Sequence, residues 1–214
     1  MNKNSLYSIL FCIVLIVNNG FSQHNWEYRS NYEIKYSVSD GIDFKLKPKI
    51  WFEGIIKEHY SSDIEIGFDK KLNNWLSLSS YYRYIIIFKE NSRLIEYRPH
   101  ADIMFSYRFN EISFQSRNRI EYRIRNSDKS FRYRNKLTIK KSDCLNNRIL
   151  ISISEEPFYD CTNKEYVKNR VYFNLGLPIK NKLSINIVYI LENNKKGEKW
   201  QAVNVFGTTL KYKI

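Results

Sequence analysis

The chain has 214 residues, with 35 Lys and Arg against 22 Asp and Glu, and a formal net charge of +13. Such a charge would ordinarily suggest a nucleic-acid partner. Here the basic residues alternate with apolar ones, and no nucleic-acid motif is present, so we exclude nucleic acid. The length suits a single folded domain.

The N-terminus has the pattern of a secretory signal peptide. An apolar run over Leu6–Val17 follows a lysine, and the small residues Gly20 and Ser22 stand at −3 and −1 of the expected cut. The run of about 12 residues is too short for a spanning helix, which needs roughly 20. We therefore predict a cleaved leader over 1–22 and a mature domain over 23–214.

Alternation of apolar and polar residues dominates the mature chain. A strand sends successive side chains to opposite faces, so each alternating segment has one apolar and one polar face. Trp26–Val38 alternates weakly and is an eleventh candidate beside ten clearer segments. These ten segments cover residues 43–53, 63–69, 76–86, 95–107, 111–125, 131–140, 148–154, 167–175, 183–192 and 200–214.

The segment Glu111–Arg125 shows the pattern most clearly. Four arginines fall on one parity with Glu121, whereas residues such as Phe114 and Ile120 fall on the other. Behind an export signal, this pattern predicts a transmembrane β-barrel with an apolar outside and a polar inside. We expect an all-β, single antiparallel up-and-down barrel of about ten strands, with twelve as the alternative.

The connections between segments suggest an orientation. They are short at 109–110 and 179–181 and longer at 155–165 and 193–199, as expected of periplasmic turns and outer loops. A soluble exported β-barrel or sandwich that binds a ligand is the alternative, in which the apolar parity points inward and the arginines face water.

Several short motifs along the mature chain carry a family resemblance. They are the early strand at Trp26, the pair Tyr82-Arg83, the pair Arg98-Pro99, the run Arg117-x-Arg119-x-Glu121-x-Arg123, and Arg132-Tyr133-Arg134. They resemble a family of small Gram-negative outer-membrane barrels that is known only as a domain of unknown function. The resemblance implies a barrel in the bacterial outer membrane and supplies no activity or catalytic residues.

The polar faces predict a charged lumen. Its expected basic residues are Arg83, Arg98, Arg117, Arg119, Arg123, Arg125, Arg132, Arg134, Lys136 and Arg170. Like charges on adjacent strands repel, so acidic partners are needed. The expected partners are Glu53, Glu65, Glu96, Asp102 and Glu121. Two interpretations stay open: a salt-bridged interior that braces a narrow, structural barrel, or a porin-like basic constriction that favours small anionic solutes.

An enzyme is the second functional class. His100 and Asp102 share a face, and serines such as Ser77, Ser79 and Ser106 are candidates for a barrel hydrolase acting on lipid or peptide. The chain has only 3 His and no recognisable nucleophile motif, so the sequence favours a non-enzymatic role. Because no His/Cys cluster is present, we expect neither a metal nor another cofactor.

Two further expectations concern the loops and the cysteines. Outer-loop lysines, among them Lys57, Lys89 and Lys164, suit the phosphates of lipopolysaccharide, although solvated loops look the same. Cys144 and Cys161 flank the expected strand 148–154. They should therefore stay unpaired, because a strand rises about 3.3 Å per residue and a disulfide needs Cα atoms within about 7 Å.

Overall fold

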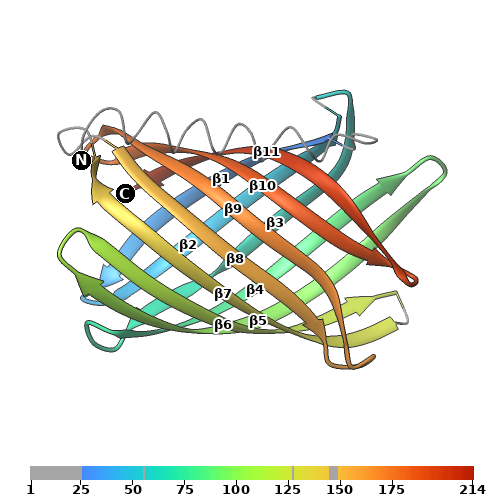
Figure 1. Cartoon of the computed structure of the whole chain (residues 1–214), viewed down its shortest axis with the longest axis horizontal. Helices are drawn as coiled ribbons and strands as arrows, with labels where there is room; N and C mark the ends of the chain where they lie inside the picture. Colours follow the sequence, from blue (N-terminus) through green and yellow to red (C-terminus); the bar gives the residue numbers. More distant parts are fainter. Residues whose placement is uncertain (1–25, 55, 127, 145–148) are drawn as a thin grey trace.

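The computed structural model describes residues 26–214 except 55, 127 and 145–148, so the predicted leader lies outside the described residues. The described chain forms one closed barrel of eleven strands (Figure 1). The strands are β1 (Trp26–Ser39), β2 (Ile42–Glu53), β3 (Glu58–Lys71), β4 (Leu76–Lys89), β5 (Ser92–Phe109), β6 (Ile112–Arg125), β7 (Asp128–Asp143), β8 (Ile149–Asp160), β9 (Glu165–Lys180), β10 (Leu183–Lys196) and β11 (Lys199–Lys213).

The strands follow one another around the barrel in chain order. Every consecutive pair is antiparallel, and the barrel closes through a parallel pairing of β1 with β11, from Trp26 opposite Asn204 to Lys35 opposite Lys213. The parallel closure is a consequence of the odd number of strands, because the first and last of eleven strands that alternate in direction point the same way. The prediction of an all-β barrel is confirmed in this form.

The predicted strand count of ten, or twelve, is wrong, because the weak candidate Trp26–Val38 is a complete strand. Its outward parity includes Ser30 between Tyr28 and Tyr32, and its inward parity includes Asn31. Uncharged polar residues therefore stand on both faces, which blurs the alternation. The hydrogen bonds of β1 to both β2 and β11 make it a full member of the barrel wall.

The predicted difference in loop length between the two ends is also wrong. The expected loops 155–165 and 193–199 are mostly strand, since β8 runs to Asp160 and β10 to Lys196. In the second half of β8 an acidic side chain, Glu155, is exposed on the outside and an aromatic one, Phe158, is buried inside, so this half was predicted to be a loop. Connections are short at both rims of the barrel.

We name the two rims by the chain end. The C-terminal rim carries Ile214 and the strand ends at which β1 leads to β2, β3 to β4, β5 to β6, β7 to β8 and β9 to β10. The opposite rim carries the strand ends at which β2 leads to β3, β4 to β5, β6 to β7, β8 to β9 and β10 to β11. Cys144 follows β7 at the C-terminal rim and Cys161 follows β8 at the opposite rim, and both are free thiols, as predicted.

The two parities of each strand face opposite sides of the wall. Large apolar side chains are exposed on the outside, including Phe114, Ile120 and Leu137. Charged side chains of the other parity are buried inside, including Arg119, Glu121 and Arg134. This orientation is the reverse of the one that the soluble alternative requires.

The interior is not polar throughout. Tyr172, Val188, Ile190, Val203 and Val205 form a buried apolar cluster on β9, β10 and β11. On the other side of the barrel, Tyr81 lies across Gly67 of the neighbouring strand, where an added Cβ would meet the ring at 2.5 Å and the Ser80 carbonyl oxygen at 2.2 Å. The absence of a side chain at Gly67 therefore lets an aromatic ring fill part of the lumen.

Candidate functional site

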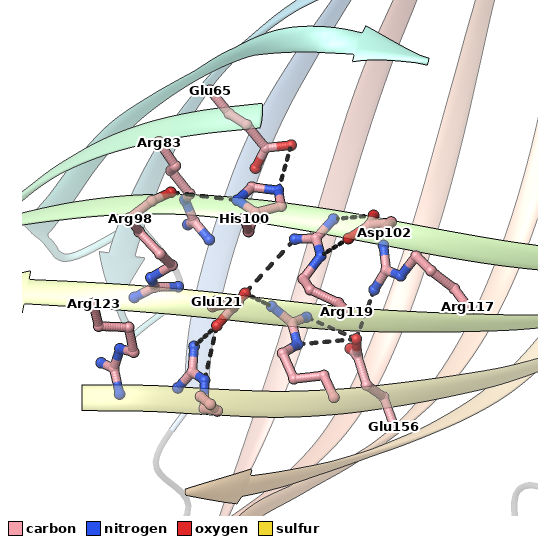
Figure 2. A network of polar contacts seen from close by, with 12 residues as sticks. Glu65, Arg83, Arg98, His100, Asp102, Arg117, Arg119, Glu121, Arg123 and Glu156 are labelled. Carbon is pink, nitrogen blue, oxygen red and sulfur yellow. Dashed lines mark hydrogen bonds and ion pairs between the residues drawn. The ribbon is translucent and has the colours of Figure 1, made fainter. Parts of the chain in front are cut away.

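A network of buried ion pairs connects the inner faces of the neighbouring strands β5, β6, β7 and β8 (Figure 2). At its centre is Glu121, which has no exposed surface. The two carboxylate oxygens accept hydrogen bonds from Arg132 at 2.5 Å and from Arg134 at 2.6 Å, and Arg119 lies 3.7 Å away. One carboxylate thus compensates the charge of several guanidinium groups.

A second carboxylate extends the network to β8. Glu156 is also completely buried and accepts hydrogen bonds from Arg117 at 2.6 Å, from Arg134 at 2.7 Å and from the Tyr172 hydroxyl. Arg134 therefore bridges Glu121 and Glu156. Removing any one of these residues would leave an uncompensated buried charge, which strongly destabilises a folded protein.

Two more acids complete what we call the septum. Asp102 binds Arg119 through two hydrogen bonds of 2.6 and 2.7 Å. Glu96 accepts hydrogen bonds from Arg98, Arg123 and Arg125. The septum consists of the acids Glu96, Asp102, Glu121 and Glu156 with the arginines Arg98, Arg117, Arg119, Arg123, Arg132 and Arg134.

Further ion pairs line the remaining wall. Asp63 binds Arg83 through two hydrogen bonds of 2.9 and 2.5 Å, and Glu65 binds Lys47 and Lys49. On the far side, Glu192 binds Arg29, Lys168 and Arg170, each within 3.0 Å. Every strand except β2 contributes at least one buried inward side chain in the described part of the barrel.

Aromatic rings separate the crowded cations. Phe158 is buried in the lumen, with the guanidinium carbons of Arg134, Arg170 and Arg132 at 4.3, 5.0 and 5.1 Å from its ring centre. Trp51 receives Arg29 in the same way at 4.3 Å. The negative face of an aromatic ring attracts a cation by about 0.5 to 2 kcal/mol. The rings therefore supply attraction where carboxylates are too few.

The septum borders a cavity at the C-terminal rim, which we call the vestibule. The cavity has a volume of about 420 Å³. Asn73, Asn74 and Trp75 line it near the rim, and Asp102, Arg117 and Arg119 line it where it meets the septum. The septum acids Glu96, Glu121 and Glu156 have essentially no exposed surface.

The structure places nearly all of the predicted lumen residues inside. Arg83, Arg98, Arg117, Arg119, Arg123, Arg125, Arg132, Arg134 and Arg170 form ion pairs, as do the predicted acids Glu65, Glu96, Asp102 and Glu121. Glu53 is the exception, because it ends β2 and is exposed at the opposite rim. Lys136 points inward without a carboxylate partner among the described side chains.

Sequence reasoning missed several members of the network. Asp63 has the same parity as Glu65, and Glu192 the same parity as Ser184, so alternation alone points to both. Glu156 and Phe158 were missed because the second half of β8 was predicted to be a loop. Arg29 was missed because the alternation of β1 is weak.

His100 is not arranged for catalysis. Its ring is buried against Tyr81, with the ring centres 5.5 Å apart, and Nδ1 lies 3.4 Å from the Arg98 carbonyl oxygen. Asp102, the expected partner, is occupied by Arg119, and Nε2 of His100 lies 4.0 Å from Glu65. Within the described ranges no serine hydrogen-bonds to His100.

The described residues contain neither a metal centre nor a membrane-spanning helix. Over the described residues, no group of three or more His, Cys, Asp and Glu side chains is placed to hold a metal ion. The same residues contain no helix that is long and apolar enough to cross a membrane.

Comparison with known protein families gives a match over most of the chain. A family model described as a protein of unknown function matches residues 24–203, which is most of the chain. No curated protein matches the chain.

Proposed function

The chain belongs to the DUF2490 family of proteins of unknown function, and from this premise we propose that it is a non-enzymatic outer-membrane β-barrel with a lumen closed by the septum. The observation that carries this proposal is the two-faced wall, with exposed apolar side chains outside and buried ion pairs inside. A bilayer covers an apolar exterior at no hydrophobic cost, whereas water does not.

The distribution of exposed side chains on the outer face supports a membrane location. Toward the C-terminal rim the exposed aromatic residues include Tyr36, Phe44, Phe68, Trp75, Phe105, Tyr107, Phe109 and Tyr212. Toward the opposite rim they include Tyr97, Phe131, Tyr166 and Trp200. Exposed aliphatic residues lie between, among them Ile64, Ile66, Ile103, Ile120 and Ile153. Aromatic girdles around an aliphatic band are typical of outer-membrane barrels.

The strand lengths suit the same location. The strands have 12 to 18 residues, whereas a tilted strand needs about 9 to 11 to cross the hydrocarbon core. The extra length places the turns and rim charges outside the apolar layer. Each strand can therefore span a bilayer without burying its turns.

The septum favours the braced, structural interpretation over an open anion pore. An open pore needs continuous water, but Glu121 and Glu156 have no exposed surface and Phe158 is buried beside them. The basic residues that the pore hypothesis used are instead bound to carboxylates. Anions can still be attracted into the vestibule, which opens at one rim only.

We propose that the C-terminal rim faces the periplasm, because the connections at the opposite rim carry the lysines that the sequence assigned to the outer loops. The opposite rim then faces outward. It carries the lysines expected to meet lipopolysaccharide phosphates, namely Lys57, Lys89, Lys129, Lys164, Lys195, Lys196 and Lys199. Clustered positive charge at an anionic lipid surface supports this assignment.

Conductance across a planar bilayer tests the closed lumen. We expect the wild-type protein to show no steady current. The double variant Arg134→Ala, Phe158→Ala removes a bridging guanidinium and a buried ring, so it should open an ion path with anion preference, since the remaining wall is basic.

The matched control is Phe131→Ala, which removes the same ring from the exposed outer face of β7. It should remain silent. Folding of each variant is checked by its heat-modifiable migration on a gel. A steady current through the wild-type barrel would contradict the closed septum.

A further inference from the structure

We propose that the vestibule holds a binding site for a small organic or inorganic anion, with Arg117 as the cationic residue that lines it and Lys136 as a second positive charge beside Arg117. This inference rests on the proposed closed barrel, in which the vestibule is a blind pocket. The observation behind it is an imbalance of charge at one corner of the septum, where Arg117 and Lys136 stand opposite each other and the carboxylate that Arg117 binds, Glu156, is shared with Arg134.

The imbalance follows from the register of β6 and β7. Arg117 stands directly opposite Lys136, and both side chains point inward. Side chains in such a pair have Cβ atoms about 5 Å apart, so their charges repel. Among the described residues, the ion-pair partner of Arg117 is Glu156, which also binds Arg134 and the Tyr172 hydroxyl. Arg117 therefore shares its carboxylate with Arg134.

Neither of the two residues is saturated by the described part of the protein. Lys136 is not paired with any described carboxylate, and its Nζ instead lies 3.5 Å from the ring centre of Tyr172. Arg117 makes one hydrogen bond to Glu156, and its buried Nε has no described partner. By contrast, Arg119 and Arg83 each donate two hydrogen bonds to one aspartate.

Arg117 is also accessible, unlike the other septum arginines around it. Its side chain is 27% exposed, against 7% for Arg119 and Arg134, and it lines the vestibule. A planar guanidinium with free N–H groups binds carboxylate and phosphate oxygens through charge-assisted hydrogen bonds. Lys136 does not line the cavity, but it adds a second positive charge opposite Arg117.

The rest of the vestibule suits a small polar ligand. Ser77, Ser79 and Ser106 supply hydroxyl groups, and the volume of about 420 Å³ is within the range of small-molecule sites. Of the acids that line the cavity, Asp43, Asp69 and Asp102 are paired with Lys35, Lys45 and Arg119, whereas Glu33 forms none of the described ion pairs. The three paired aspartates therefore repel an incoming anion less than free carboxylates would. The ligand chemistry is a single carboxylate or phosphate group on a small body.

Isothermal titration of the purified, folded barrel in detergent tests the site. The probes are inorganic phosphate and acetate, with glycerol as the uncharged comparison. We expect at least one anion to bind with one-to-one stoichiometry and glycerol not to bind. The preferred probe distinguishes phosphate from carboxylate chemistry.

Arg117→Gln is the decisive variant, because Arg117 lines the vestibule, and it should weaken anion binding at least tenfold while leaving Glu156 bound to Arg134. Lys136→Gln breaks none of the ion pairs that hold the septum, and it should weaken binding by a smaller factor. The control is Lys71→Gln, which removes a lysine that also lines the vestibule but lies at the end of β3, and it should change binding less than twofold.

Two results would overturn the anion site. One is wild-type barrel that is folded and silent in a bilayer but binds neither anion. The other is binding that Lys136→Gln and Arg117→Gln leave unchanged. A conducting wild-type barrel would instead count against the proposed closed lumen, so the two hypotheses fail separately.

Discussion

Ile120→Arg should prevent most of the protein from inserting into lipid vesicles. Ile120 lies near the middle of β6, and its side chain is 60% exposed on the outer face. If that face meets hydrocarbon, a charge there costs about 2 to 4 kcal/mol near the midplane and about 0 to 1 near the interface. The fraction of folded protein after dilution from urea into vesicles measures the effect.

Phe109→Arg is the matched control for this variant. Phe109 is also 60% exposed, but it ends β5 at the C-terminal rim, where an arginine reaches the polar interface. We expect it to insert nearly as well as the wild type. In a barrel surrounded by water, two equally exposed positions would respond alike, so equal insertion of the two variants would contradict a lipid-facing wall.

Glu121→Gln should destabilise the folded barrel by about 3 to 5 kcal/mol, the usual result of removing one partner from a buried ion pair. Glutamine keeps the shape of the side chain, but it removes the charge and replaces one accepting oxygen by an NH2 donor. Arg132 and Arg134 would then lose the carboxylate that they reach at 2.5 and 2.6 Å. Denaturation in urea, followed by tryptophan fluorescence, measures the change in free energy of unfolding.

Glu165→Gln makes the same chemical change at the opposite rim. Glu165 pairs with Lys195, and the two side chains are 40% and 29% exposed. Exposed pairs contribute about 0 to 1 kcal/mol, so the free energy of unfolding should barely move. If both glutamine variants lost the same small amount of stability, the septum would not be holding the barrel together.

The alternation of residues predicted the barrel and the direction of its faces. Strand β6 needed no further information, because its arginines and its apolar residues separate cleanly by parity. Strand β8 could not be predicted over its full length, because Glu155 points outward and Phe158 inward. Alternation reports which residues share a face, and it fails wherever a face changes its chemistry.

The septum could be predicted only in part. Parity placed Arg117, Arg119, Glu121 and Arg134 inside, but it did not show that Glu156 joins Arg117 to Arg134. That contact depends on the register of β7 against β8 and on how the barrel closes through β1. The vestibule depends further on the volume of rings such as Trp75 and Tyr81, which line it and which periodicity does not measure.

The two cysteines of the predicted mature chain allow the central claim, a barrel that crosses the outer membrane, to be tested most directly. Cys161 lies exposed at the opposite rim and Cys144 lies at the C-terminal rim. Cys144→Ser and Cys161→Ser each leave one thiol for a membrane-impermeant maleimide. On intact cells we expect Cys161 to be labelled at once and Cys144 only after the outer membrane is permeabilised. Labelling of both thiols on intact cells, or of neither until permeabilisation, would contradict a barrel that spans the membrane.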